Sequence, residues 1–243
     1  MFKPTIGIIG NGRFGSLIFN TFKKSDIFEV RIFSRRENPD GLNFFSLKEV
    51  CECDIVIPAV PISAFENQIK SIRKLLKPST LLVDVCSVKT HPVKVMLRNL
   101  PEDIDILATH PMFGPDSTRN GETFQKLKFI WAKVRIKNNE LADQFLALWK
   151  DLGCELIELS PEEHDKQAAY THAFAFLIGK IGMKMNVRRN SISTKGFEGI
   201  LYNQTAVEND TGQLFEDMMK FNPFAEEMRL SFRKALENIE NQL

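Results

Sequence analysis

Three glycines, Gly10, Gly12 and Gly15, constrain the fold of this chain more than any other feature of its sequence. They form the pattern G-x-G-x-x-G directly after a β-branched run, Thr5–Ile9, and directly before a helical segment that begins near Ser16. In that position Gly10 permits a tight turn, Gly12 lets a pyrophosphate approach the backbone, and Gly15 lets helix and strand pack closely. The pattern therefore predicts a dinucleotide-binding turn, and a glycine-rich turn without a ligand is the alternative. The predicted binding residues are Gly10, Asn11, Gly12, Arg13, Phe14 and Gly15.

The end of the next predicted strand, Glu29–Phe33, indicates which nicotinamide cofactor would bind. NAD-binding folds place an acid about 20 residues beyond the glycines, and this count from Gly15 reaches Arg35. The sequence there is Ser34-Arg35-Arg36, and a hydroxyl with two guanidinium groups suits the 2′-phosphate of NADP. We therefore predict NADP. A ribose contact from Glu37, which would favour NAD, and a solvated basic turn are the alternatives.

Strands and helices alternate through the first two thirds of the chain. Apolar runs predict strands at residues 54–58, 80–85, 129–134 and 154–158, and amphipathic patterns predict helices at residues 63–76 and 139–152. This alternation predicts an α/β fold with a doubly wound parallel sheet up to about residue 159. Val60 and Pro61, in the turn after the third strand, are expected to lie beside the cofactor.

Residues 108–117, ATHPMFGPDS, follow an apolar run at residues 104–107 that predicts a short strand. Two prolines and a glycine predict a rigid loop at the carboxyl end of that strand, where open α/β sheets bind ligands. Its histidine, His110, exchanges protons near neutral pH, although a turn with a buried histidine is the alternative.

Ser87 follows the predicted strand 80–85 and is expected at the same sheet edge as His110. Its hydroxyl there would orient the imidazole or hold a substrate oxygen, and capping a helix is its alternative role. Lys89 is expected to be a solvated lysine in the first turn of that helix.

Composition excludes several classes of function. The chain has 243 residues, of which 32 are basic and 31 acidic, so its net charge of +1 gives no electrostatic case for nucleic acid or an anionic membrane. Its apolar runs fall well short of the roughly 20 residues that span a bilayer. The first residues lead directly into a strand, which predicts no signal peptide and a cytoplasmic protein. Its four cysteines, which lack metal-ligand spacing, are expected to be buried, reduced thiols: Cys51, Cys53, Cys86 and Cys154.

The last third of the chain has a helical pattern. Ser160, Pro161 and Glu163 predict a helix start with a capping box, and the helix can run to about residue 188. Its middle, residues 168–185, is apolar on most sides and is expected to be buried, whereas His164 is expected at the surface. Further helices are predicted at residues 213–220 and 225–241. A helical domain of about 80 residues has only a thin hydrophobic core on its own.

Three motifs in this order resemble the prephenate and arogenate dehydrogenases of tyrosine biosynthesis. They are the glycine pattern, Asp84-x-x-Ser87-Val88-Lys89, and His110-Pro111-Met112-Phe113-Gly114-Pro115. The histidine motif looks most like the arogenate-type branch, and Ser34-Arg35 resembles its NADP-dependent members. The resemblance implies a Rossmann-type domain at residues 1–159 and an all-helical domain at residues 160–243 that binds substrate and interlocks in a homodimer.

The resemblance also implies an activity, the oxidative decarboxylation of arogenate or prephenate. His110 would take the proton of the ring hydroxyl, assisted by Ser87, as hydride leaves that carbon for the nicotinamide of NADP. Loss of carbon dioxide then gives an aromatic ring. An NADP-dependent enzyme of the same architecture acting on another small hydroxy or keto acid is one alternative. A regulatory module that binds NADP without catalysis is another.

Substrate-binding residues of the helical domain are implied less completely. His172 matches a serine/threonine-histidine pair of the family, with a core histidine as the alternative, and a further family histidine falls on Ala175. The arginine that grips the ring carboxylate in many prephenate-using members falls on Tyr202, with Asn203 and Gln204 beside it. The remaining candidates for that carboxylate are Arg188, Arg189, Lys195 and Arg119. A cationic helix C-terminus is the alternative role of the first two.

Overall fold

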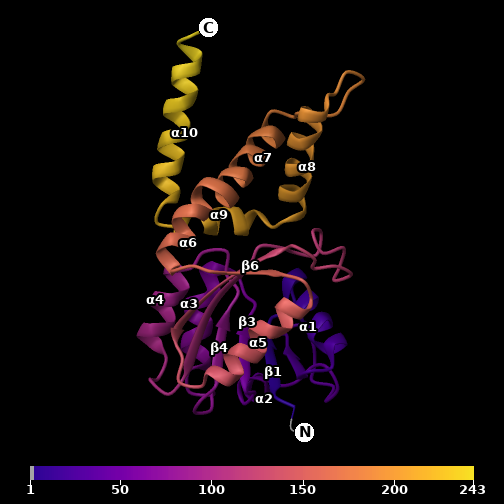
Figure 1. Cartoon of the computed structure of the whole chain (residues 1–243), viewed down its shortest axis with the longest axis vertical. Helices are drawn as coiled ribbons and strands as arrows, with labels where there is room; N and C mark the ends of the chain where they lie inside the picture. The colour runs from indigo at the N-terminus through magenta and orange to yellow at the C-terminus, as the bar shows by residue number, and fades with distance from the viewer. Residues whose placement is uncertain (1–2) are drawn as a thin grey trace. The chain divides into compact units, whose positions relative to one another are not determined.

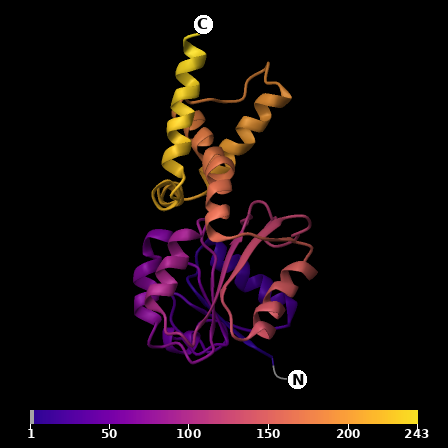
Figure 2. The ribbon, with the colours of Figure 1, turned by 60° about the vertical axis from the view of Figure 1, so that its left-hand side comes forward.

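The structure is a computed structural model that describes residues 3–243. The chain divides into two compact units, Met1–Pro161 and Glu162–Leu243 (Figure 1). The first unit is a sheet with helices on both of its faces, and the second is made of helices (Figure 2). The predicted fold class, a doubly wound α/β sheet followed by helices, is confirmed.

Within residues 3–161 the sheet has seven strands in the order β2-β1-β3-β4-β5-β6-β7. Their bounds are β1 Thr5–Ile9, β2 Glu29–Phe33, β3 Ile55–Pro58, β4 Leu81–Asp84, β5 Asp105–Pro111, β6 Lys128–Arg135 and β7 Glu155–Glu158. Strands β3, β4 and β5 are buried along their whole length, as expected for strands that are covered on both faces. The order reverses at β1, which pairs with β2 on one side and with β3 on the other.

Five helices of the first unit cover the sheet. They are α1 Arg13–Ser25, α2 Leu47–Cys51, α3 Ile62–Ile72, α4 Thr90–Asn99 and α5 Asn139–Asp151. Helices α1 and α5 lie on one face and α3 and α4 on the other (Figure 1). Trp149 of α5 is fully buried and stacks on Phe129 of β6 at 5.0 Å between ring centroids. Phe113 lies 5.6 Å from the same indole, so the core anchors the chain three residues beyond His110.

The prediction of a purely parallel sheet is wrong at two strands, β6 and β7, which both run opposite to β1–β5. β6 runs antiparallel to β5, and β7 runs parallel to β6. The connection from β5 to β6, residues 112–127, contains turns and no helix among its described residues. Without a crossover helix the chain returns at the same sheet edge, which makes the pair antiparallel.

The predicted loop at residues 108–117 is also partly wrong, because β5 continues to Pro111. Pairing with β6 carries the strand through the motif, with His110 opposite Ile130 and Pro111 opposite Phe129. A proline at the end of a strand is tolerated because few ladder hydrogen bonds remain for it to break. His110 is therefore held by a strand on one side rather than by a free loop.

The helices of the second unit are α6 Pro161–Ala168, a π-helical turn η1 Ala169–Ala173, α7 Phe174–Lys184, α8 Lys195–Asn209, α9 Gly212–Phe221 and α10 Ala225–Glu240. The first three form one continuous helix that ends at Lys184, short of the predicted residue 188. It ends there because Asn186 adopts a left-handed conformation, with φ of 56°. The N–H groups of Asn186 and Val187 then donate to the carbonyls of Met183 and Gly182, which closes a Schellman motif.

Burial of the apolar segment 168–185 is confirmed only in part. Ala169, Ala173 and Phe176 are buried, but Tyr170 and Met185 are exposed. Helix α8, which was not predicted, packs closely on α7. A Cβ added at Gly179 of α7 would lie 2.8 Å from the Val207 side chain of α8.

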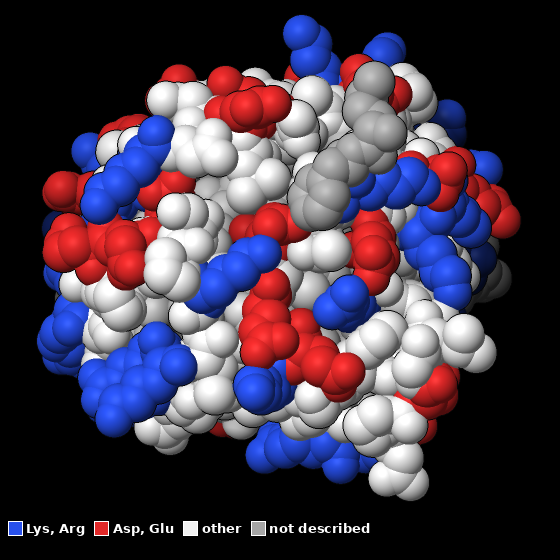
Figure 3. Space-filling view, turned by 90° about the horizontal axis from the view of Figure 1, so that it is seen from below, with Lys and Arg blue, Asp and Glu red and all other residues white. Residues whose placement is uncertain are grey.

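Three general features of the helices, the surface and the core complete the fold. In the part of the chain that the structure describes, each helix is too short or too polar to cross a membrane. Basic and acidic side chains are interspersed over the face drawn in Figure 3. The four cysteines are buried, as predicted, and burial raises the pKa of Cys51 to about 12.

Candidate active site

The carboxyl ends of β1 to β5 meet at one edge of the sheet, because these five strands are parallel. Across that edge the chain presents Ser34 after β2, the turn at Gly10 after β1, Val60 after β3, Ser87 after β4, and His110 near the end of β5. The fold thus places the predicted cofactor residues and the two predicted catalytic residues side by side in the order of the strands. This is the edge at which open α/β sheets bind ligands.

The glycine turn has the geometry that a phosphate group needs. Gly10 has φ of +114°, and a Cβ there would lie 2.4 Å from the carbonyl oxygen of Ala59. A Cβ at Gly15 would lie 2.0 Å from the carbonyl oxygen of Gly10, whereas a Cβ at Gly12 would meet no described atom within 4 Å. Gly12 is the N-cap of α1 and provides no side chain to cap it. The backbone around Gly12 is therefore open to an anion at a helix N-terminus.

The other residues of this turn are fixed by local contacts. The Ser16 hydroxyl donates to Asn11 Oδ1 at 2.6 Å, and Phe14 is half-buried. Arg13, the first residue of α1, pairs with Asp116 at 2.7 Å, which ties the turn to the segment beyond β5. Val60 is half-buried, and its Cγ1 lies 3.7 Å from the position of a Cβ at Gly10, so β3 supplies one wall of the turn.

The residues after β2 form a turn of their own. Ser34 is half-buried, and its hydroxyl oxygen accepts from the backbone N–H of Arg36 at 3.2 Å. Arg35, Arg36 and Glu37 are all exposed. The guanidinium groups of Arg35 and Arg36 and the carboxylate of Glu37 therefore face solvent beyond β2, at the carboxyl edge of the sheet. Pro61, at the β3 end, is exposed and is the N-cap of α3.

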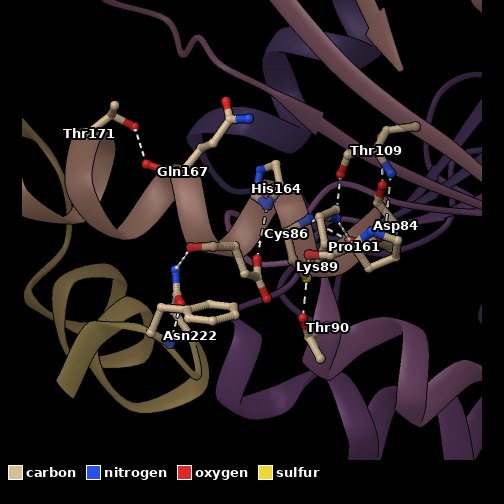
Figure 4. Close-up of polar contacts among 12 residues, drawn as sticks. Asp84, Cys86, Lys89, Thr90, Thr109, Pro161, His164, Gln167, Thr171 and Asn222 are labelled. Atoms are coloured by element: carbon tan, nitrogen blue, oxygen red, sulfur yellow. Dashed lines mark hydrogen bonds and ion pairs between the residues drawn. The ribbon is translucent and has the colours of Figure 1, made fainter. Parts of the chain in front are cut away.

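A buried ion pair lies where β4 ends. Lys89 is 2% exposed and pairs with Asp84, which is fully buried, so the prediction of a solvated lysine is wrong. The Lys89 ammonium also donates to the carbonyl of Thr109 (Figure 4). Burial raises the pKa of Asp84, and Lys89 together with the N–H donors on the carboxylate opposes that rise.

Ser87 lies three residues beyond the end of β4, and His110 lies near the end of the adjacent strand β5. Helix α4 begins at Thr90 with Lys89 as its N-cap, so Ser87 does not cap it and that alternative is wrong. Ser87 is half-buried, and His110 is 2% exposed. The β4–β5 register, in which Asp84 lies opposite Ala108, sets the two segments beside each other.

The second unit has a polar cluster around His164. His164 is 3% exposed and its Nδ1 lies 2.9 Å from Asp165 Oδ1, so its predicted surface position is wrong. Asn222, from the turn between α9 and α10, donates to the carbonyl of Asp165 at 2.8 Å (Figure 4). It also accepts from the N–H of Phe224 at 2.9 Å. These contacts fix α6 against the start of α10.

The π-helical turn changes how His164 and His172 lie relative to each other. The N–H of Phe174 bonds to the carbonyl of Ala169, five residues earlier, so the turn holds one extra residue. Eight residues of regular α-helix would place the two imidazoles about 80° apart, and the extra residue reduces this to about 20°. Burial, with a further contribution from His164, lowers the pKa of His172 to about 4.

The four candidates for a carboxylate clamp are all exposed. Arg188 is exposed and donates to Asn186 Oδ1 at 2.7 Å, and Arg189 pairs with Glu198. Both follow the end of α7, so a cationic helix terminus is wrong as their role. Lys195 is exposed at the first position of α8, and Arg119 is exposed in the first unit. Each candidate cation thus reaches solvent.

The residues that stand where the family arginine was expected have structural contacts. Tyr202 is 76% exposed. Asn203 donates to the carbonyl of Ala175 at 2.7 Å, and Gln204 donates to the carbonyl of Val187 at 3.4 Å. These two amides join α8 to α7 and to the segment that follows it, which gives this stretch a role in packing.

Two buried polar residues, Lys89 in the first unit and His164 in the second, were expected in solvent. The motif Asp84-x-x-Ser87-Val88-Lys89 contained the signal for the first, because a lysine five residues after a buried strand's final aspartate can reach it. The second had a weaker signal, an aspartate next in sequence. Among residues 3–243 no three His, Cys, Asp or Glu side chains gather as metal ligands would.

Family models match two stretches of the chain. Residues 41–158 match the model of the prephenate dehydrogenase nucleotide-binding domain, and residues 181–243 match a TYRAAT1-like C-terminal domain. Among solved structures of similar fold are prephenate dehydrogenase from A. aeolicus, in complex with hydroxyphenyl propionate and NAD+, and Synechocystis arogenate dehydrogenase. Their TM-scores are 0.76 and 0.70 over 99% and 98% of this chain and 91% and 92% of theirs, each at 16% identity. These show the fold.

Curated relatives are more similar in sequence. The chain is 35% identical to arogenate dehydrogenase 1, chloroplastic, of Arabidopsis thaliana over 98% of its length, and it spans 39% of that protein. It is 32% identical to arogenate dehydrogenase 2, chloroplastic, of the same plant, again over 98% of its length and over 69% of the relative. This chain belongs to the prephenate and arogenate dehydrogenase family.

Proposed function

We propose that this protein is an NADP-dependent dehydrogenase that catalyses the oxidative decarboxylation of arogenate or prephenate in tyrosine biosynthesis. The observation that carries the proposal is the placement of Ser87 and His110 at the ends of adjacent parallel strands, on the same edge as the glycine turn. The two plant relatives, named arogenate dehydrogenases, support the same activity.

Each residue of that edge has a proposed role. His110 accepts the proton of the ring hydroxyl, and Ser87 orients the imidazole or the substrate oxygen. A bound nicotinamide supplies the acceptor for the hydride. The burial of His110 supports this assignment, because a base held away from water keeps one orientation toward the substrate. Aromatisation of the ring supplies much of the driving force, so positioning is the main task of the protein.

The cofactor is proposed to be NADP, bound by residues 1–159. The open backbone at Gly12 suits the pyrophosphate, and the exposed guanidinium groups of Arg35 and Arg36 suit a 2′-phosphate. Val60 and Pro61 would line the path of the cofactor past β3. Residues 160–243 are proposed to contribute substrate binding through His172, Lys195 and Arg188, the last two being exposed cations that suit carboxylates.

The protein is also proposed to be a homodimer that forms through its helical unit. Phe232, Leu236 and Ile239 follow one another at helical spacing on α10, and the last two are 47% and 56% exposed. An exposed apolar stripe of this kind is typical of a helix that packs on another copy. The cytoplasmic location stays a prediction from the sequence.

The experiment that tests the activity is reduced-nicotinamide formation by the purified protein, with arogenate and prephenate each offered with NADP and with NAD. We expect turnover of at least one substrate with NADP. His110→Asn should keep cofactor affinity and lose about 100-fold or more of kcat, the range of a general base. Replacement of Arg35 and Arg36 by Ala should weaken NADP far more than NAD, and Arg98→Ala, on the outer helix α4, is the matched control.

The opposite outcomes are equally clear. Unchanged turnover in His110→Asn would remove the assigned base, and equal losses of NADP and NAD would remove the assigned phosphate contacts. NADP binding without turnover of either substrate would favour another hydroxy acid or a regulatory role, and Tyr202, where the family arginine was expected, would then be the first position to examine.

A further inference from the structure

The buried Asp84–Lys89 pair continues the sheet where β4 stops. Strand β4 ends at Asp84, while β5 runs on to Pro111, so Thr109 has no strand beside it on the β4 side. The Asp84 carboxylate accepts from the N–H of Thr109 at 3.3 Å, and the Lys89 ammonium donates to the carbonyl of Thr109. Two charged side chains thus bond the backbone groups that a neighbouring strand would otherwise bond.

The same carboxylate holds the segment that contains Ser87. Asp84 Oδ1 accepts from the N–H of Cys86 at 3.0 Å, and the Thr109 hydroxyl donates to the carbonyl of Asp84 at 2.6 Å. The network of Asp84 and Lys89 is therefore bonded to Cys86, the residue before Ser87, and to Thr109, the residue before His110 (Figure 4).

Such a pair is a costly way to stabilise a fold. Both side chains are at most 3% exposed, and the desolvation of two buried charges offsets most of their attraction. Apolar side chains of similar size would stabilise a core as well. What they could not do is bond the N–H of Cys86 and both backbone groups of Thr109 at once.

We propose that Lys89, acting through Asp84 and Thr109, is a positioning residue that sets the separation of Ser87 and His110. This inference rests on the proposed function, since it takes Ser87 and His110 as the reacting pair. The ammonium itself touches the backbone next to His110, so its loss should displace the base while leaving the cofactor turn intact. A misplacement of about 1 Å costs on the order of 100-fold in rate.

The test replaces the pair by neutral side chains of similar shape, Asp84→Asn with Lys89→Met, so that no buried charge is left unpaired. We expect a folded protein with wild-type KM for NADP and a kcat that is lower by about 10- to 100-fold. The matched control is Asp54→Asn with Lys77→Met, a Lys–Asp pair at 2.7 Å at the amino edge of the same sheet. It should change thermal stability and leave kcat unchanged.

Two further measurements keep the test decisive. Lys89→Arg retains the positive charge opposite Asp84, but its longer, planar guanidinium cannot occupy the place of the compact ammonium without displacing Asp84 or Thr109, so its kcat should fall at least about fivefold. NMR of histidine-labelled protein should show the His110 imidazole signals moving in the double variant and not in the control.

Wild-type kcat in a folded double variant or in Lys89→Arg would overturn the inference. If the wild-type protein turned over neither substrate, the proposed function would fail separately, and the NMR spectra would still decide the positioning: unmoved His110 signals would refute it.

Discussion

The imidazole of His172 is kept neutral by its surroundings. Burial is the main cause, His164 adds to it, and the ring of Phe176 packs edge-on at 5.0 Å. A pKa of about 4 in the folded chain lies below the ordinary value of 6.5. Because the unfolded chain takes up this proton first as pH falls, His172 destabilises the folded state progressively below about pH 6.5, until the folded pKa is reached.

This linkage predicts a pH dependence that one substitution removes. Between pH 7 and pH 5 the free energy of unfolding of the helical unit should fall by about 1–2 kcal/mol through His172 alone. His172→Phe keeps an aromatic ring beside Phe176 but cannot take up the proton. Its free energy of unfolding should therefore fall by about 1–2 kcal/mol less than that of the wild type between pH 7 and pH 5. Urea unfolding followed by circular dichroism at both pH values measures this difference. The same pH dependence in both chains would contradict the prediction.

At the residue scale the sequence predicted where the proposed reacting groups lie but not which polar residues are buried. Ser87 and His110 follow apolar runs, and the ends of parallel strands meet at one edge, so their neighbourhood could be predicted. Lys89 and His164 were expected in solvent. Their burial depends on partners, Asp84 and Asp165, whose side chains come into contact only when the local backbone has turned toward them.

At the scale of an element, two glycines in the turn from β1 to α1 have different roles: Gly12 leaves open space, and Gly15 allows a close backbone contact. Gly12→Ala adds a methyl group in open space at φ of −80°, whereas Gly15→Ala drives a Cβ to 2.0 Å from the carbonyl oxygen of Gly10. We expect Gly12→Ala to melt within a few degrees of the wild type and to bind NADP at least about tenfold more weakly. Gly15→Ala should lose several kcal/mol of stability.

Thermal unfolding and cofactor titration of the two variants give both quantities. A Gly12→Ala protein with wild-type affinity for NADP would show that no phosphate approaches this turn. Gly41→Ala is an unsuitable control because its φ of +69° strains any side chain, whereas Gly114→Ala, in open space beyond β5, is suitable.

Element types could be predicted where the apolar pattern was strong. The strands at Thr5–Ile9 and Glu29–Phe33 and the helix at Asn139–Asp151 follow β-branched runs or an amphipathic repeat. Helix α8 could not be predicted, because it contains two glycines and Val207 is its only residue buried among those described. The reversed direction of β6 is equally invisible in sequence, since an apolar run carries no information on which way a strand crosses the sheet.

At the scale of the whole molecule, the exposed stripe on α10 predicts a dimer. The wild-type protein should have roughly twice the chain mass of 27.8 kDa in solution. Leu236→Glu with Ile239→Glu places charges on the stripe and should give the monomer mass with an unchanged helical content. Glu237→Gln, on the same helix, is the control. Light scattering at several concentrations measures the mass, and a monomeric wild-type protein would refute the proposal.

The two-part organisation was predictable for a simple reason, since strand patterns stop near residue 158 and helical ones follow. The sequence also indicated that the helical part has a thin core, and the exposed Tyr170, Met185 and Leu236 agree with that. The partners of these side chains could not be predicted from the sequence, because an apolar surface does not specify what covers it.

The wide turn at Ala169–Ala173 has a consequence for how homologous chains are aligned. One extra residue in a helical turn is equivalent to a single-residue insertion, and it rotates every later side chain by about 100° about the axis. A homologue with an ordinary α-helix here presents the same face with one residue fewer. Correspondences beyond residue 173, including the histidine expected at Ala175, should therefore be drawn with a one-residue gap inside that turn.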